Sequence, residues 1–211
     1  MRNFKALILV AMFAVSAMVS AQSFSYGITA GVGVSNLSGD VKSVKAKIGF
    51  KAGVFGDFEF SPEMSIQTGL FYVTKGAKFD WGEGKEVVNP SFNFGYLQLP
   101  VHYASKIEVV PGTKVVLHVG PYVAYGLDGK VTGKEDGVSI SVDLYNPPTG
   151  SYFFGGKKLN RFDAGLGLGA GAEFGSIIVD LGWDYGLLNM SPINNTKIKN
   201  QSGYLTVGYK F

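Results

Sequence analysis

The stretch RFDAGLGLGAGAEFGSIIVDLGWDY, residues Arg161–Tyr185, decides the fold of this chain. From Phe162 to Phe174 every even-numbered residue is apolar, whereas the odd-numbered residues are glycine, aspartate or glutamate. After Gly175-Ser176, every odd-numbered residue from Ile177 to Tyr185 is apolar. A period of two residues is typical of a β-strand whose two faces differ chemically. The stretch therefore predicts a β-hairpin with one apolar face.

The other face of this hairpin is mostly glycine, and its polar side chains are carboxylates: Asp163, Glu173, Asp180 and Asp184. A sheet in water would cover such a face with large polar side chains. Glycine packs little and suits a crowded concave interior. An apolar outside around a narrow polar inside predicts a small barrel in a lipid bilayer.

The same alternation recurs along the chain and predicts six more strands, at 24–36, 48–60, 64–74, 96–104, 114–127 and 204–211. The connections between the eight strands alternate in length, and the long ones are 37–47, 75–93, 128–160 and 188–201. In outer-membrane barrels the short turns face the periplasm and the long loops face outside. We therefore predict an all-β, eight-stranded antiparallel up-and-down transmembrane β-barrel in the outer membrane of a diderm bacterium.

Three local features refine this prediction. Pro100 should mark a bulge or a missing ladder bond in its strand. The alternation of Val138, Ile140, Val142 and Leu144 inside the longest loop predicts a hairpin beyond the membrane. Aromatic residues should form two girdles at the membrane interfaces. The periplasmic girdle is Tyr26, Phe58, Phe60, Tyr103, Phe174, Tyr209 and Phe211, and the outer girdle is Phe50, Tyr72, Tyr125, Phe162, Trp183 and Tyr185.

The N-terminus has the pattern of a secretory signal peptide. Arg2 and Lys5 precede an apolar run from Ala6 to Val15, and small residues follow as far as Ala21. A membrane anchor is the alternative, but the run is shorter than the roughly 20 residues that a spanning helix needs. We expect residues 1–21 to be a cleaved signal peptide and residues 22–211 to form the barrel domain.

Composition excludes several classes of function. Removing Arg2 and Lys5 with the signal peptide lowers the formal charge from +3 to +1, so nothing indicates nucleic-acid binding. The chain has no cysteine, which excludes disulfides, thiolate nucleophiles and cysteine-bound metals. Its 30 glycines and 14% aromatic residues suit strands, turns and aromatic girdles.

Six segments resemble the PorT-like, porin-family outer-membrane β-barrel domain: GVGVSNLSGD, KIGFKAGVFGDFEFSPEMSIQTGLFYVTKGAK, YLQLPVHY, GPYVAYGLDGK, RFDAGLGLGAGAEFG and YLTVGYKF. Together they span nearly the whole chain after the signal peptide. The resemblance implies the barrel fold and an outer-membrane location, in a family of varied functions. Tyr209 and Phe211 resemble the terminal signal that the outer-membrane assembly machinery recognises. The likeness to PorT implies, by analogy, an accessory role in a secretion machine.

The predicted strands place a polar network inside the barrel: Lys51, Asp57, Glu59, His102, His118, Arg161, Asp163, Glu173, Asp180, Asp184 and Lys210. Eight strands enclose about enough room for side chains alone, so a salt-bridged interior that blocks a channel is the main interpretation. A narrow cation-preferring pore is the alternative, because the charged members are three positive and six negative.

Catalytic interpretations find little support. His102 and His118 could meet as a metal or acid/base pair, but the sequence offers neither a third ligand nor a nucleophile beside them. Gly165-x-Gly167-x-x-Ala170 resembles a dinucleotide fingerprint, but the strand alternation runs through it where that motif needs a helix. We expect no enzymatic activity, no cofactor and no bound metal.

The expected partners follow from the membrane setting: outer-membrane lipid and lipopolysaccharide, the assembly machinery, and an extracellular ligand or a secretion partner. Basic loop residues near the outer leaflet would neutralise lipopolysaccharide phosphates. We expect a monomer with a structural or surface-binding role through its extracellular loops. The alternatives are a narrow pore for ions or small solutes and an accessory barrel of a secretion machine. A soluble lipid-carrying barrel is the structural rival, but it would need a polar outer face.

Overall fold

The structure is a computed structural model that describes residues 23–40, 44–79, 88–135, 138–148, 157–193 and 195–211. The strands are β1 (Ser23–Gly39), β2 (Val44–Ser61), β3 (Met64–Phe79), β4 (Val88–Val110), β5 (Thr113–Glu135), β6 (Val138–Asp143), β7 (Phe162–Phe174), β8 (Ile177–Gly186) and β9 (Ile198–Lys210). In these residues no helix is long and apolar enough to cross a membrane. The predicted signal peptide, residues 1–21, lies outside the described residues.

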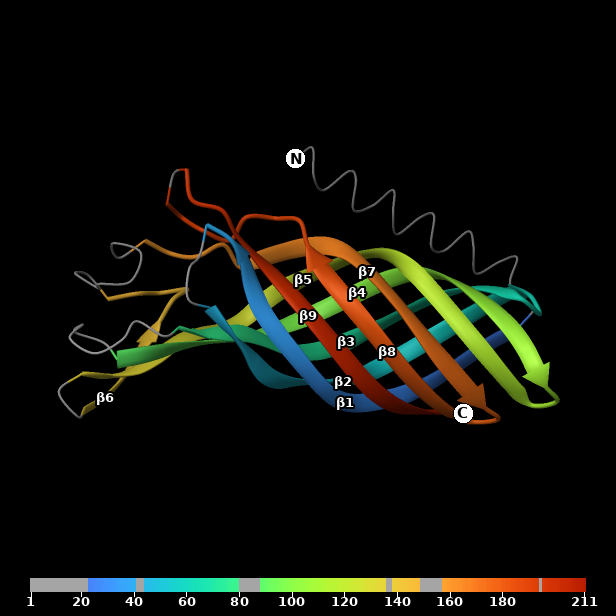
Figure 1. Ribbon diagram of the computed structural model, residues 1–211. Coiled ribbons are helices and arrows are strands. Elements are labelled where there is room, and N and C mark those ends of the chain that lie inside the picture. The colour runs from blue at the N-terminus through green and yellow to red at the C-terminus, as the bar shows by residue number, and fades with distance from the viewer. Residues whose placement is uncertain (1–22, 41–43, 80–87, 136–137, 149–156, 194) are drawn as a thin grey trace.

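The strands close into a barrel. They form one antiparallel sheet in the order β4-β3-β2-β1-β9-β8-β7-β5-β6, and an additional pairing of β4 with β5 closes the ring. β6 stands outside the ring as a hairpin partner of β5, with Lys130 opposite Asp143 and Glu135 opposite Val138. The eight remaining strands run up and down around an elongated barrel (Figure 1). The predicted eight-stranded fold is confirmed, and so is the extra hairpin inside residues 128–160.

The two ends of the barrel differ in their connections. At one end, which we call the turn end, two-residue turns join the strands: Pro62-Glu63, Pro111-Gly112 and Gly175-Ser176. Gly112 and Gly175 have φ angles of 79° and 60°, which favour glycine because it has no Cβ. At the other end, the loop end, the connections are longer, and the β5–β6 hairpin extends from it (Figure 1).

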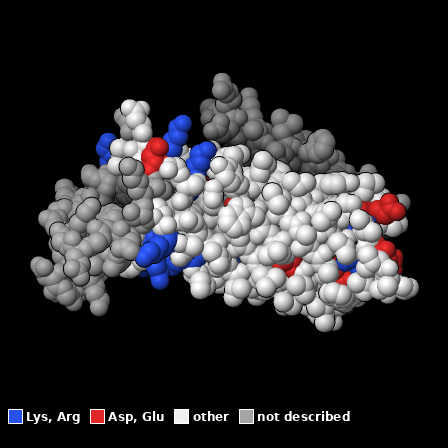
Figure 2. All heavy atoms as spheres, in the orientation of Figure 1, with Lys and Arg blue, Asp and Glu red and all other residues white. Residues whose placement is uncertain are grey.

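The outward face is apolar over the middle of the barrel. Val32, Ile48 and Leu181 are 61%, 78% and 62% exposed, which an ordinary protein in water would avoid for a whole surface. Figure 2 shows this band as an uncharged surface with charged side chains toward both ends. Aromatic side chains gather at its borders, where Tyr26 lies 5.6 Å from Phe211 and Phe50 lies 5.6 Å from Tyr72, measured between ring centroids. Both predicted girdles therefore contain neighbouring rings.

Several strands are longer than the alternation predicted. β3 continues to Phe79, β4 runs from Val88 to Val110, and β5 runs to Glu135, so the expected loops at 75–93 and 128–160 and the expected turn at 105–113 are partly strand. β9 likewise begins at Ile198, within the expected loop 188–201. The loop at 37–47 is also shorter, because β1 ends at Gly39 and β2 begins at Val44.

The pattern of β4 explains why its extension was missed. Phe92 and Phe94 are buried inside the barrel, whereas the alternate residues Ser91 and Asn93 are only partly buried. Farther along the same strand the pattern reverses, because Leu97 and the outward residues after it are apolar. Beyond the bilayer, the apolar side of a strand faces the interior of the barrel instead of lipid. A pattern in which the apolar residues face outward therefore ends at the membrane boundary.

Pro100 interrupts the ladder without shifting it. Pairing of β3 with β4 stops at Thr68 opposite Val101 and resumes at Phe71 opposite Gln98 in the same register. Proline has no backbone N–H to donate, which accounts for the gap. Of the two predicted outcomes, the missing ladder bond is confirmed and the bulge is not.

Candidate functional site

Inward-facing polar side chains fill the barrel in three layers, and an apolar cap closes its loop end. The layers follow from strand alternation, since every second residue of each strand points inward. Their partners come from strands that are distant in the sequence. We take this lumen as the candidate functional site.

The turn-end cluster consists of Lys106, Asp57, Glu59, Glu173 and Lys210. The buried Lys106 ammonium forms an ion pair with Asp57 and lies 2.7 Å from Glu59 Oε1 and 3.3 Å from Glu173 Oε1. Lys210 Nζ donates to the other oxygen of Glu173 at 2.6 Å. Two ammonium groups thus hold three carboxylates where the barrel meets its short turns, and they close this end with charged side chains.

The histidine layer lies in the middle of the barrel and consists of Lys51, His102, His118, Asp180 and Asp184. His118 Nε2 lies 2.9 Å from Asp180 Oδ1, and its Nδ1 lies 2.9 Å from His102 Nδ1. Lys51 is buried, with its ammonium 3.4 Å from the centroid of the Tyr204 ring. Asp184 Oδ2 accepts a hydrogen bond of 2.8 Å from the Gln98 amide. These contacts join strands β2, β4, β5, β8 and β9.

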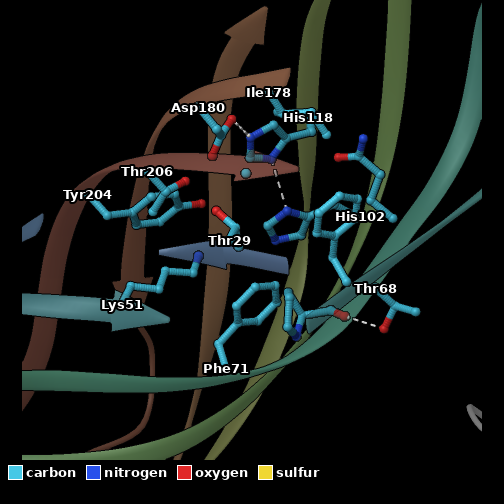
Figure 3. Close-up of a pocket in the computed structure, with 14 residues that line it drawn as sticks. Thr29, Lys51, Thr68, Phe71, His102, His118, Ile178, Asp180, Tyr204 and Thr206 are labelled. Atoms are coloured by element: carbon cyan, nitrogen blue, oxygen red, sulfur yellow. Dashed lines mark hydrogen bonds and ion pairs between the residues drawn. The ribbon is translucent and has the colours of Figure 1, made fainter. Parts of the chain in front are cut away.

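A cavity of about 90 Å³ opens beside this layer. Lys51, His102, His118 and Asp180 line it together with the Tyr204 ring (Figure 3). The volume is large enough for a few water molecules, and the wall combines polar groups with apolar side chains such as Phe71 and Ile178. The middle of the lumen is therefore open space bordered by ionisable groups.

The loop-end cluster surrounds Asp163. Lys75 Nζ lies 3.3 Å from Asp163 Oδ2, to which the Tyr122 hydroxyl and the Asn200 amide also donate at 3.3 and 3.1 Å. The Lys75 ammonium also faces the ring of Tyr122, 4.5 Å from its centroid. The Asn200 amide also donates a hydrogen bond to the Tyr96 hydroxyl oxygen. The carboxylate is buried but has a cation and several donors around it, as a buried charge requires.

The apolar cap lies above the loop-end cluster and is built from buried side chains of strands and connections. Its members are Leu37, Ala77, Phe79, Phe92, Phe94, Tyr96, Tyr122, Ala124, Val131, Leu144, Tyr145, Leu159, Met190 and Ile198. Tyr145, which follows β6, places its ring 4.6 Å from the Arg161 guanidinium. Burial raises the pKa of the Tyr145 hydroxyl to about 12, so it stays neutral within the cap. The loop end is thus closed by a hydrophobic core.

The glycine-rich strand β7 makes room for the inward rings. A Cβ at Gly165 would lie 2.8 Å from the Tyr122 ring, one at Gly167 2.7 Å from His102 Nε2, and one at Gly169 2.4 Å from His118 Nε2. These three inward glycines therefore each face a ring of another strand. The match to a dinucleotide fingerprint has this structural explanation, because a continuous strand, Phe162–Phe174, runs through it.

The predicted network is distributed over these layers. The structure brings His102 and His118 together, and it joins Asp57, Glu59, Glu173 and Lys210 through Lys106. Arg161 lies apart from them, against Tyr145 near the loop end. Of the expected assembly signal, Tyr209 faces outward on β9, and the N–H of Phe211 donates to the carbonyl of Tyr26.

The predicted polar network lacks two cations, Lys75 and Lys106, because both residues were assigned to connections between strands. Both are buried and inward-facing. The parity of their strands could have identified them, since Lys106 continues the inward series of His102 and Ala104, and Lys75 continues that of Phe71. With them the inward charges are nearly balanced, which weakens the argument for a cation-preferring pore.

The chemistry available in the lumen is that of ion pairs and proton exchange. Within the described ranges, no three side chains of His, Cys, Asp or Glu are grouped to hold a metal ion. The histidine pair contacts a carboxylate, but no serine or threonine is hydrogen-bonded to either ring in the described part of the chain. The contacts seen are ion pairs and hydrogen bonds that link strands across the lumen.

Comparison with known proteins agrees with this architecture. Residues 20–191 match the model of a family described as the outer membrane protein beta-barrel domain. No curated protein matches the chain.

Similar solved structures include outer-membrane proteins. OprG from Pseudomonas aeruginosa is 11% identical, with 90% of this chain and 97% of that chain covered and a TM-score of 0.50. The attachment invasion locus protein Ail of Yersinia pestis is 17% identical, with coverages of 90% and 100% and a TM-score of 0.47. Neisserial surface protein A is 12% identical, with coverages of 90% and 98% and a TM-score of 0.45. At these identities the likeness concerns the fold alone.

Proposed function

The chain belongs to the outer membrane protein beta-barrel domain family, and we propose that it is a non-enzymatic barrel with a closed lumen that acts through its extracellular surface. An outer-membrane location follows from the family. The finer PorT-like assignment stays a prediction from the sequence. The orientation with the loop end outside follows the general rule for such barrels.

The observation that carries this proposal is the closure of the lumen at both ends. The turn-end cluster crosses the axis with charged pairs around Lys106, and the apolar cap fills the loop end. An ion would have to break buried ion pairs and then cross a hydrophobic core. Both steps are costly, so these features favour a structural or binding role over conduction.

The surface offered for binding is the loop end. The β5–β6 hairpin projects from it (Figure 1), and Figure 2 shows basic side chains gathered beside the uncharged band at this end. The exposed lysines described there are Lys45, Lys78, Lys130, Lys157, Lys158 and Lys197. Lys45 and Lys78 are direct register partners on β2 and β3. Exposed lysines gathered at this border suit the phosphates of lipopolysaccharide, because a phosphate accepts charge-assisted hydrogen bonds from several donors.

Conductance tests the closed lumen. Purified protein in a planar bilayer should give no discrete current steps over the range of voltages that the bilayer tolerates. Reproducible steps would overturn the proposal in favour of the narrow pore for ions or small solutes.

Lipid binding tests the surface. We expect lipopolysaccharide in the vesicle membrane to raise the urea midpoint of the wild-type barrel relative to phosphatidylcholine alone. The double substitution Lys45→Gln and Lys78→Gln should abolish most of that increase. The matched control is Lys114→Gln, which removes a lysine from the turn end of β5. An equal increase in all three proteins would contradict the phosphate-binding role.

A shortened hairpin separates folding from binding. Replacing residues 134–139 by Asn-Gly would join the register partners Gly133 and Ile140 through a two-residue turn. The barrel should still fold. Retention of the lipopolysaccharide-dependent increase in the urea midpoint would assign phosphate binding to the strand-end lysines, as proposed, and its loss would move the binding site to the hairpin.

A further inference from the structure

The two histidine rings lie end to end in one line. Their Nδ1 atoms are 2.9 Å apart, their centroids are 5.0 Å apart and their planes are tilted by 14°. For two rings in one line, the centroid distance would equal the Nδ1–Nδ1 distance plus one ring radius for each ring. The observed centroid distance is only slightly shorter than this sum. The two nitrogens therefore point directly at each other, which is the geometry of an N–H···N hydrogen bond and not of two ligands converging on a metal.

The carboxylate at one end sets the tautomers. Asp180 accepts, so His118 Nε2 carries a hydrogen and donates to it. A neutral ring then has an acceptor at Nδ1, and His102 must donate to it from its own Nδ1. This leaves His102 Nε2 as a bare acceptor. It is buried, and within the described part of the chain it has no hydrogen-bond partner.

A second orphaned acceptor faces the same point. Asp184 Oδ1 is also buried and has no partner among the described residues. A Cβ built on Gly167 would lie 2.7 Å from His102 Nε2 and 2.9 Å from Asp184 Oδ1, so both atoms surround the space that this glycine leaves free. Two buried acceptors that border the same space, neither of them with a donor, are stabilised by a positive charge between them.

The net charge of the histidine layer also indicates that a positive charge is missing. Lys51 from β2 supplies one positive charge, and Asp180 and Asp184 from β8 supply two negative ones. β9 contributes the Tyr204 hydroxyl, and the residues that β1, β3 and β7 turn toward the pair, among them Thr29, Gln67 and Gly169, carry no charge. With neutral imidazoles the layer therefore carries one uncompensated negative charge.

We propose that the His102–His118 pair is a proton-binding site that takes up one proton on His102 Nε2 and shares its charge between Asp180 and Asp184. The bound proton satisfies both orphaned acceptors and neutralises the layer. It also completes an unbroken line of hydrogen bonds, Asp180–His118–His102–Asp184, that ties β4 and β5 to both ends of β8. No bond other than those to the proton is made or broken.

The site has a route for the proton. The Asp180 side chain is 21% exposed, and both histidines line the mid-lumen cavity (Figure 3). A proton that enters from this cavity binds directly at His102 Nε2, because the hydrogens of the line point from His102 toward Asp180 and cannot carry a proton in the opposite direction. Acidification of the surroundings is thereby coupled to the internal cross-linking of the barrel.

Histidine NMR tests the proposal on the unmodified barrel. The chain has two histidines, so His118→Gln suffices to assign the signals of ¹⁵N-labelled protein in detergent micelles. Between about pH 9 and about pH 4, both rings should titrate with one common midpoint and a total uptake of one proton. Two separate midpoints with two protons, or no titration in this range, would overturn the proposal. So would a spectral change on adding Zn²⁺ that a chelator reverses, because the site would then be a metal site.

A substitution with a matched control tests the role of Asp184. Asp184→Asn keeps the shape but removes the charge that faces His102 Nε2, so the proton affinity should fall at least about tenfold, a shift of about one pH unit. Asp128→Asn removes the same charge from the loop end of β5, where Asp128 accepts from Tyr72. Its midpoint should match the wild type. Equal titration midpoints in the two variants would refute the proposed proton-binding site.

Discussion

Lys106 on β4 reaches Glu173 on β7 across the turn end of the lumen, with 3.3 Å between Nζ and Oε1. The same ammonium pairs with Asp57 on β2. In the ring order β2-β3-β4-β5-β7, these two carboxylates lie on opposite walls of the barrel. One side chain therefore ties together strands that share no backbone hydrogen bond.

Replacing Lys106 should destabilise the barrel. Lys106→Met leaves the Asp57 and Glu59 carboxylates uncompensated, and breaking a buried ion pair costs about 3 to 5 kcal/mol of unfolding free energy. Urea unfolding in lipid vesicles measures the change. Lys130→Met, at an exposed lysine near the loop end, should stay within about 0.5 kcal/mol of the wild type. Equal changes in unfolding free energy for the two substitutions would show that the Lys106 ammonium does not stabilise the turn-end cluster.

A methyl group on Gly169 should collide with His118. The Cβ of Gly169→Ala would lie 2.4 Å from His118 Nε2, and overpacking of this kind costs about 1 to 3 kcal/mol. A double-mutant cycle isolates the ring contact: after His118→Ala the cost should be smaller but not zero, because the Cβ would still lie 2.7 Å from the carbonyl oxygen of Leu181. An unchanged cost in that background would assign the strain to the Leu181 backbone on β8 alone.

A charge on the outward face should be penalised according to depth. Leu168 lies in the middle of β7 and is 57% exposed, so Leu168→Arg should lower the unfolding free energy by about 2 to 4 kcal/mol in a bilayer. Leu127→Arg, at an outward position near the loop end of β5, should cost about 0 to 1 kcal/mol. The reverse order would contradict the assignment of the uncharged band to the bilayer core.

Truncation in the apolar cap should loosen the loop end alone. Phe94 is 2% exposed and its ring centroid lies 6.4 Å from that of Tyr145. Phe94→Ala removes about 3 to 5 kcal/mol of packing, so trypsin should cut the β5–β6 hairpin faster while the barrel strands stay protected. Phe174→Ala, at an exposed ring of the turn end, should leave the cleavage rate unchanged. Faster cleavage throughout the barrel would indicate that the cap does not unfold separately.

Much of the barrel could be predicted because alternation is a local property. Leu166, Leu168 and Gly167 already show which face of β7 is outward, and the Gly175-Ser176 turn marks where the chain reverses. The prediction failed where a strand left the apolar band. Phe92 and Phe94 belong to β4, but their pattern is that of a strand in water, and Lys75 and Lys106 were lost with such extensions.

The sequence by itself determined that Arg161–Tyr185 is a hairpin, that its glycines face inward and that the chain closes as an eight-stranded barrel, because side chains of a strand alternate with a period of two. Only the tertiary structure decided which inward groups meet. Lys75 and Asp163 are 88 residues apart, and His102 meets His118 at a height set by the stagger of the strands around the ring. That stagger arises when the sheet closes on itself, and no local pattern encodes it.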